Sequence, residues 1–266
     1  MRVLAYEVRR LRGLRSTWFL LGAVLLADAV VTALLARQLP AGELGAAAAV
    51  RTVTAVVPLL PLPIAALGAG ALGALSYGHE VRHPGLPASR VSYRRRLALL
   101  TGKLAVTGVV AALLAAVTVA VDAPVLRLAL APGAHAHRVF SAAAVHPDHF
   151  GRAGSVLQPL LVFLGVVVFA GWVGLLLTSL VRSAAAGLLI LCALPVLAEP
   201  ATTLALRQFG SGGWPEQLRE VLPVGLPYDL ERLPSGNGPL VLGVLLAPPV
   251  VLLAGCLLLQ ARRRAL

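Results

Sequence analysis

One acidic residue, Asp28, interrupts the long apolar run Thr17–Ala36. An ionisable group in such a run costs free energy in a membrane, and it usually faces the interior of a helix bundle or a water-filled path. Asp28 therefore either lines a substrate pathway or pairs with a cation, or else it is protonated or hydrogen-bonded to a neighbouring helix. The sequence leaves these interpretations equally open. Glu199 is weaker evidence of the same kind, because it lies beside Pro200 near the expected outer end of another run.

The remaining side chains that could do chemistry lie mostly outside the apolar runs. No nucleophile elbow of the G-x-S-x-G type occurs, and no G-x-x-x-x-G-K-[ST] loop that would cradle the phosphates of a nucleotide. The two cysteines, Cys192 and Cys256, lie in apolar runs, where we expect them to pack. Four histidines and an aspartate gather in one polar segment without the spacing of a metal site: His135, His137, His146, His149 and Asp148. We therefore expect neither an enzymatic site nor a metal site.

The composition places these residues in a membrane protein. Of 266 residues, 58% are hydrophobic and 13% charged, and the mean hydropathy is +0.86. Soluble domains are about 45–50% apolar and about 25% charged, so an ordinary soluble enzyme is excluded. Because backbone polar groups cannot stay unpaired in hydrocarbon, each long apolar run should cross as a helix. Six runs qualify: Thr17–Ala36, Val53–Ser76, Leu104–Val121, Val156–Val181, Ser183–Leu206 and Pro239–Gln260.

The basic residues set the expected orientation of these helices. Of the 23 Lys and Arg residues, 15 lie before the first run, between the second and third, between the fourth and fifth, or at the end of the chain. Since Lys and Arg are held on the cytoplasmic side, both termini should be cytoplasmic. We therefore attribute the net charge of +12 to the basic residues that orient the protein in a lipid bilayer, and we expect no nucleic-acid partner.

The predicted fold is an all-α integral membrane protein with six transmembrane helices. A basic amphipathic helix over residues 1–16 should lie on the inner leaflet, because its apolar positions recur at helical spacing between arginines. One transmembrane domain would cover residues 1–266, with an inner segment at 77–103 and outer segments at 122–155 and 207–238.

The inner segment is the most informative part of the chain, because it is long and strongly basic. It reads Tyr77-Gly78-His79-Glu80-Val81-Arg82-His83, then Pro84-Gly85-Leu86, then Ser89 to Arg96, with Lys103 at the next run. This order resembles the cytoplasmic loop of the ABC type-2 exporter permeases, in which a G-x-E-x-R-H-G-T-like stretch leads into a short coupling helix, an Arg-rich step and a Lys. The six runs, a tight turn at Leu180–Ser183 and a Pro-rich segment at Leu222–Pro227 also resemble that family.

The resemblance implies a permease subunit of an exporter in the bacterial plasma membrane, a multi-pass protein without its own nucleotide site. Two copies of an ABC ATPase subunit would carry ATP and Mg²⁺, and a second permease chain would complete a homodimer or heterodimer. The ATPase-coupling residues would be Glu80, Val81, Arg82, His83, Leu86, Arg90 and Arg94. Pro84-Gly85 replaces the Gly-Thr of the family and Pro87 follows, which would shorten or displace the coupling helix.

An ion-coupled secondary transporter is the alternative. In that case Asp28 would carry the coupling proton, and intramembrane charge would matter more than the inner segment. Such transporters are often built from inverted repeats, and this sequence shows no repeat. The substrate is not indicated under either hypothesis.

Overall fold

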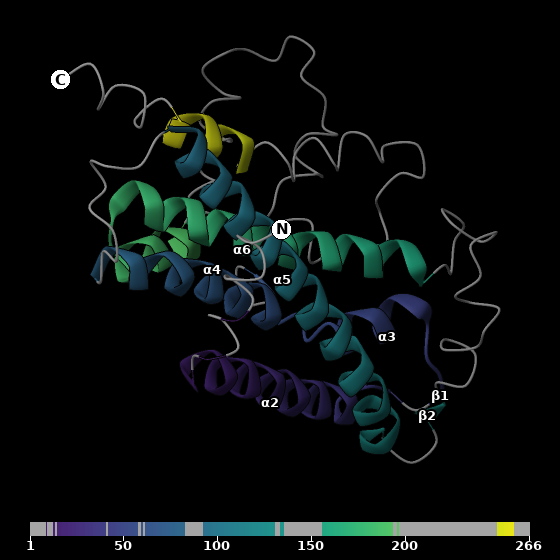
Figure 1. The fold of residues 1–266 in the computed structure, drawn as a ribbon. Helices are drawn as coiled ribbons and strands as arrows, with labels where there is room; N and C mark the ends of the chain where they lie inside the picture. The colour runs from purple at the N-terminus through teal and green to yellow at the C-terminus, as the bar shows by residue number, and fades with distance from the viewer. Residues whose placement is uncertain are drawn as a thin grey trace, which may run out of the picture.

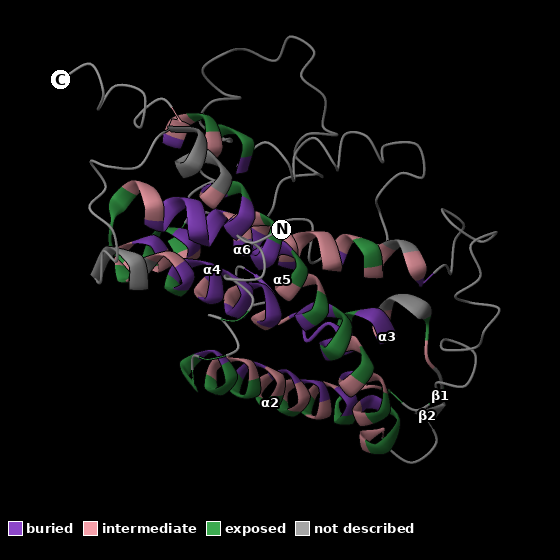
Figure 2. Cartoon of the chain, viewed as in Figure 1, coloured by how far each residue is buried: buried purple, intermediate pink, exposed green. Residues whose placement is uncertain are grey.

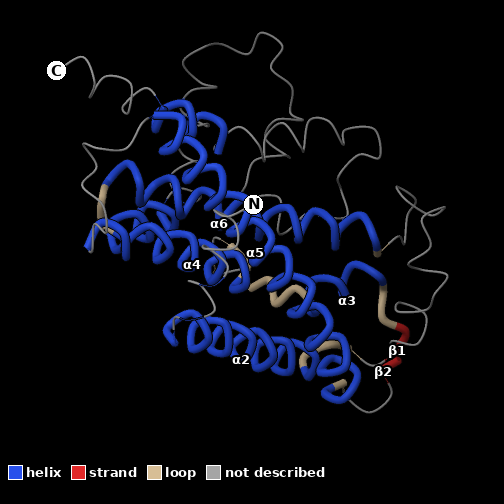
Figure 3. Tube along the Cα trace, in the orientation of Figure 1, coloured by secondary structure: helices blue, strands red, loops and turns tan. Residues whose placement is uncertain are grey.

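Helices form nearly all of the regular structure in the computed structural model (Figures 1 and 3). The structure describes residues 15–40, 42–57, 62–82, 93–130, 134–135, 156–193 and 249–257, and the single positions 9, 13, 60 and 196. The helices are α2 (Arg15–Arg37), α3 (Ala46–Val53), α4 (Ile64–Arg82), α5 (Tyr93–Ala129) and α6 (Leu157–Val181). Two further helical segments cover Ala184–Ala193 and residues 249–257. The expected helix over residues 1–16 lies outside the described residues, apart from positions 9, 13, 15 and 16, which are helical.

Within the described ranges, three helices are long and apolar enough to cross a membrane: Arg15–Arg37, Leu99–Ala129 and Pro159–Val181. Large apolar side chains are exposed along α2, among them Phe19, Leu26 and Leu34. Exposure of so much apolar surface is unfavourable in water and favourable in lipid. The exposed positions run along this helix in Figure 2. The helices indicate a membrane-embedded protein, in agreement with the composition.

The second apolar run does not form the single helix Val53–Ser76 that its hydropathy predicts. Helix α3 ends at Val53, and α4 begins only at Ile64. Pro58, Pro61 and Pro63 lie between them, and proline lacks the N–H that a helix interior needs. At its other end α4 continues beyond the run to Arg82, into the expected inner segment. Its apolar part, Ile64–Tyr77, is shorter than the three long helices.

The chain directions alternate through the first four long helices. Helices α2 and α5 run from one end of the molecule toward α3 and the β1–β2 pair, whereas α4 and α6 run the opposite way (Figure 1). The strands β1 (Gly42–Glu43) and β2 (Ala134–His135) follow α2 and α5 and pair in parallel. This short pairing holds the C-terminal ends of α2 and α5 at the same end of the bundle.

Small residues allow α4 and α6 to pack closely. A methyl group at Gly73 would collide with the carbonyl oxygen of Gly171, and one at Gly174 would collide with the carbonyl oxygen of Gly70. Membrane helices commonly use small residues in this way, because backbones then approach within van der Waals contact. The glycines of α4 therefore serve helix packing in this structure.

Helix α6 also contacts α5 and then turns sharply. Trp172 donates its indole N–H to the carbonyl oxygen of Leu104 on α5 at 2.8 Å. After Val181, Arg182 adopts a left-handed conformation (φ 59°) and its N–H bonds the carbonyl of Thr178 at 2.8 Å, so the next helix begins at Ala184. The tight turn expected at Leu180–Ser183 is confirmed.

We predict that Gly73→Ala and Gly174→Ala each lower the free energy of unfolding by about 1–3 kcal/mol, because the added methyl overpacks the α4–α6 contact. Gly22→Ala is the matched control, since nothing lies within 4 Å of a methyl group at Gly22 on α2. Thermal unfolding of the purified variants in one detergent measures the effect. Equal melting temperatures for all three variants would contradict this packing.

Candidate functional site

The strongest candidate site is a polar cluster between α2 and α5. Asp28 is fully buried in the middle of α2. Its Oδ2 accepts a hydrogen bond of 3.5 Å from the Thr118 hydroxyl of α5, while its Oδ1 has no hydrogen-bond partner among the described residues. The expected alternative of a hydrogen bond to a neighbouring helix is therefore realised for one of the two carboxyl oxygens.

A second buried carboxyl group, Asp122, faces the first. From the sequence we expected Asp122 at the start of an outer segment, because the apolar run ends at Val121. Helix α5 instead continues through Pro124 to Ala129, and Asp122 is fully buried within it. Neither of its carboxyl oxygens has a hydrogen-bond partner in the described part of the chain. Asp122 follows Thr118 by four residues, so both lie on one face of a helix, and this spacing is the feature of the sequence that could have indicated a buried Asp122.

The two carboxyl groups belong to a repeated arrangement. Asp28 and Thr32 lie one helical turn apart on α2, and Thr118 and Asp122 lie one turn apart on α5. Asp28 contacts Thr118, and Asp122 lies beside both Thr32 and Asp28. Each helix therefore presents an aspartate toward a threonine of the other, as two helices of the same direction in register would do.

Helix α3 closes this cluster on one side. The Thr32 hydroxyl donates to the carbonyl oxygen of Thr52, in the last turn of α3, at 2.9 Å. Thr52 is itself buried and donates within its own helix to the carbonyl of Ala48 at 2.8 Å. The C-terminal end of α3 is thus held against α2 beside the carboxyl pair.

The predicted ATPase-coupling residues lie at the other end of the bundle. Glu80, Val81 and Arg82 form the last turn of α4, and Arg94 lies in the first turn of α5. These helix ends lie away from α3 and the β1–β2 pair (Figure 1). The other predicted coupling residues, His83, Leu86 and Arg90, lie outside the described residues.

The same stretch also contains a sequence motif that bears on metal binding. His79-Glu80-Val81-Arg82-His83 matches H-E-x-x-H, in which two histidines one helical turn apart bind zinc and the glutamate acts as a base. The backbone of α4 is helical through Arg82, as that motif requires. A catalytic zinc site needs a third protein ligand, and the first Asp, Glu, His or Cys after His83 in the sequence is Asp122. Asp122 lies near the opposite end of α5, so it is not positioned to be that ligand.

No group of three or more His, Cys, Asp or Glu side chains suited to a metal ion occurs within the described ranges. Of the outer histidines, only His135 on β2 is described; the other three and Asp148 lie outside these ranges. Cys256 is buried, and its thiol lies 3.0 Å from the Ser179 hydroxyl, as expected for a packing residue.

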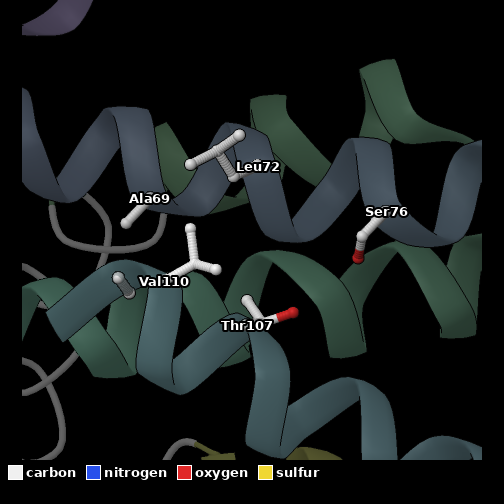
Figure 4. Close-up of a pocket in the computed structure, with 6 residues that line it drawn as sticks. Ala69, Leu72, Ser76, Thr107 and Val110 are labelled. Carbon is white, nitrogen blue, oxygen red and sulfur yellow. The ribbon is translucent and has the colours of Figure 1, made fainter. Parts of the chain in front are cut away.

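A small pocket lies between α4 and α5 (Figure 4). Ala69, Leu72 and Ser76 line it from α4, and Thr107 and Val110 line it from α5. It has room for about one water molecule, which is too little for a transported substrate. The Ser76 hydroxyl, which borders it, already donates to the carbonyl of Gly73 at 2.7 Å.

Comparison with known proteins identifies no relative: no family model, no curated protein and no solved structure matches the chain.

We predict that Thr32→Val lowers the free energy of unfolding by about 0.5–1.5 kcal/mol, because α2 loses its hydrogen bond to the end of α3. Thr52→Val is the matched control, since its hydroxyl bonds only within α3, where the Ala48 carbonyl keeps the helical backbone as a partner. Chemical or thermal unfolding in detergent measures both. If the two variants lose the same free energy of unfolding, the hydrogen bond between α2 and α3 contributes no more to stability than the bond within α3.

Proposed function

We propose that the chain is the membrane-spanning permease subunit of an ATP-driven exporter of the ABC type-2 kind, which moves a substrate across the plasma membrane with a separate ATPase. The observation that carries this proposal is the placement of the coupling motif on helix ends. Glu80–Arg82 end α4, and Arg94 lies in the first turn of α5. A partner that moves residues 83–92 would therefore move two helices of the bundle directly.

Helix α5 is suited to transmit such a motion. It runs without interruption for 37 residues, from Tyr93 to Ala129, and contacts α2, α3, α4 and α6 along its length. At about 1.5 Å per residue, a displacement at Arg94 reaches the Asp122 region some 42 Å away along one helix. Helix α4 is linked closely to α6 through the glycine contacts, so its movement would carry α6 with it.

The proposal includes six transmembrane helices with both termini in the cytoplasm. The alternating directions of α2, α4, α5 and α6 support such a topology, since successive spans must cross in opposite directions (Figure 1). The distribution of the 23 basic residues supports the orientation. In this arrangement the coupling residues face the cytoplasm, and α3 with the β1–β2 pair lies on the outer side.

Energy would come from the partner subunits. The sequence holds no phosphate-binding loop, so two ATPase copies would bind ATP and Mg²⁺ and act on a dimer of permease chains. The permease residues would then bind the ATPase and reposition helices, and no covalent step would take place on this chain.

The proposal predicts that the chain co-purifies with an ABC ATPase encoded by a neighbouring gene, and that Glu80→Ala/Arg82→Ala and Arg94→Ala each weaken the complex at least tenfold or abolish its ATPase stimulation in liposomes. Arg127→Ala is the matched control, because it removes the same charge from an exposed position near the other end of α5. Absence of any ATPase partner, or equal losses with Arg127→Ala, would contradict the proposal.

The topology makes a separate prediction. Green fluorescent protein fused after Leu266 or before Met1 should fluoresce, because it folds in the cytoplasm, whereas alkaline phosphatase inserted after Ala144 should be active, because that segment is outside. Fusions after Arg90 should behave as the termini do. Phosphatase activity after Arg90 would reverse the orientation and with it the proposed ATPase contact.

The H-E-x-x-H match supports a second candidate, a zinc-dependent membrane protease with Glu80 as its base. Zinc content separates the two candidates. A protease would purify with about one zinc per chain and lose it in His79→Ala. A permease would carry no stoichiometric zinc, and His79→Ala would leave its metal content unchanged.

The buried carboxyl of Asp28 favours a third candidate, an ion-coupled transporter. Liposomes that contain only this chain distinguish it, because a pH gradient would then drive substrate movement without ATP. Dependence on the ATPase in the same liposomes would support the exporter.

A further inference from the structure

We propose that Asp28 and Asp122 form a proton-binding carboxyl pair between α2 and α5, which holds at least one proton while the two helices are packed together. This inference goes beyond the exporter function, and it holds whether or not an ATPase drives the protein. The ligand is the proton itself, taken from water and returned to water.

The first argument is that most carboxyl oxygens of the pair are buried without hydrogen-bond partners. Both side chains are fully buried, and three of their four carboxyl oxygens have no hydrogen-bond partner within the described ranges. The fourth, Oδ2 of Asp28, accepts one long bond of 3.5 Å from Thr118. Two ionised carboxylates side by side in such surroundings would repel each other and lose their hydration. A proton on the pair removes one charge and supplies a donor.

The second argument is the end of α3. The backbone dipoles of a helix place partial negative charge at its C-terminus, and the Thr52 carbonyl in the last turn of α3 lies against Thr32, beside Asp122. This negative end adds to the repulsion of two carboxylates. A proton on the pair relieves this repulsion, because it removes one of the negative charges. Helix α3 contains one charged residue, Arg51, which is exposed.

The Thr32 hydroxyl supports protonation of its neighbour. A hydroxyl has one proton to donate, and that of Thr32 points to the Thr52 carbonyl. Its oxygen can then only accept from Asp122. An ionised Asp122 therefore receives no proton from this hydroxyl in the arrangement seen here.

Among the described residues of the neighbouring helices, the charged side chains are exposed or lie far from the pair along their helices. On α2 the charged residues other than Asp28 are Arg15 and Arg37, both exposed. On α5, Arg127 is exposed, and buried Lys103 lies 15 positions before Thr118, or about 22 Å along the helix. Arginines 94–96 are farther away at the start of α5. On α4 the titratable residues are Tyr77, His79, Glu80 and Arg82, toward its far end, and α6 has none.

The space favours a proton over a metal cation. Each unpartnered carboxyl oxygen exposes less than 1 Å². A hard cation such as Ca²⁺ takes about six to eight oxygen ligands, far more than the two carboxyl groups and two hydroxyls here. One of those hydroxyls already directs its proton to Asp28 and the other to the α3 carbonyl. A proton needs no cavity and no further ligands.

The pair would couple protonation to the packing of α2 on α5. Loss of the last proton would leave two negative charges in contact, so α2 and α5 would separate until water reached them. Conversely, proton uptake would favour the packing of α2 against α5 seen here. The equilibrium between packed and separated α2 and α5 would therefore depend on pH.

Infrared spectroscopy of the full chain in nanodiscs at neutral pH tests the proposal. The wild type should show the C=O stretch of a buried protonated carboxylic acid, shifted by H/D exchange, and Asp28→Asn/Asp122→Asn should lose it. Glu43→Gln is the control that removes a carboxyl group elsewhere, and it should keep the band. Absence of the band in the wild type, or its persistence in the double variant, would overturn the proposal.

Thermal unfolding against pH gives the second readout and also serves if the double variant does not fold. The folded pair binds more protons than exposed carboxylates do at neutral pH, so the wild-type melting temperature should fall as pH rises through the titration of the pair. Asp28→Asn and Asp122→Asn should each reduce this dependence. Stabilisation by NaCl but not by choline chloride, abolished in these variants, would identify a metal cation instead and refute the proton site.

Discussion

Polar groups inside hydrocarbon have to find partners within the protein, because no water is available to them, and the described structure follows from this constraint. Backbone groups are paired within long helices. Buried hydroxyls bond back to their own helix, as Thr178 does to the carbonyl of Gly174 at 2.9 Å and Thr54 to that of Val50 at 2.8 Å. The two carboxyl groups at the α2–α5 interface are the exception among the described side chains, because three of their four oxygens are buried without such partners. Chemistry is therefore expected there first.

The two ends of the bundle differ in kind. One end carries a basic segment on the ends of α4 and α5, and the other holds α3 and the β1–β2 pair over the carboxyl groups. Helix α5 joins the two, and the glycine contacts hold α4 against α6. A site that changes charge at one end and a partner-binding segment at the other would thus act on the same helix. This arrangement is compatible with transport, in which binding and energy input occur at separate places.

Particular residues show where prediction from the sequence succeeded and where it stopped. Asp28 was recognised because one charge in an apolar run is conspicuous. Asp122 was not, because it directly follows the apolar run Leu104–Val121, whereas in the structure α5 continues to Ala129 and packs on α2. The run Val53–Ser76 has the hydropathy of a span, yet its prolines divide it into α3 and α4, since hydropathy does not register a missing N–H.

By itself the sequence determined that the protein is helical and apolar enough for a membrane, because composition and periodicity are local properties of the chain. It also determined the tight turn near Arg182 and the position of one intramembrane carboxyl group. The tertiary structure alone decided that Asp28 meets a second carboxyl group 94 positions away, and that α3 lies beside both. Such contacts depend on helix register and packing, which no local pattern encodes.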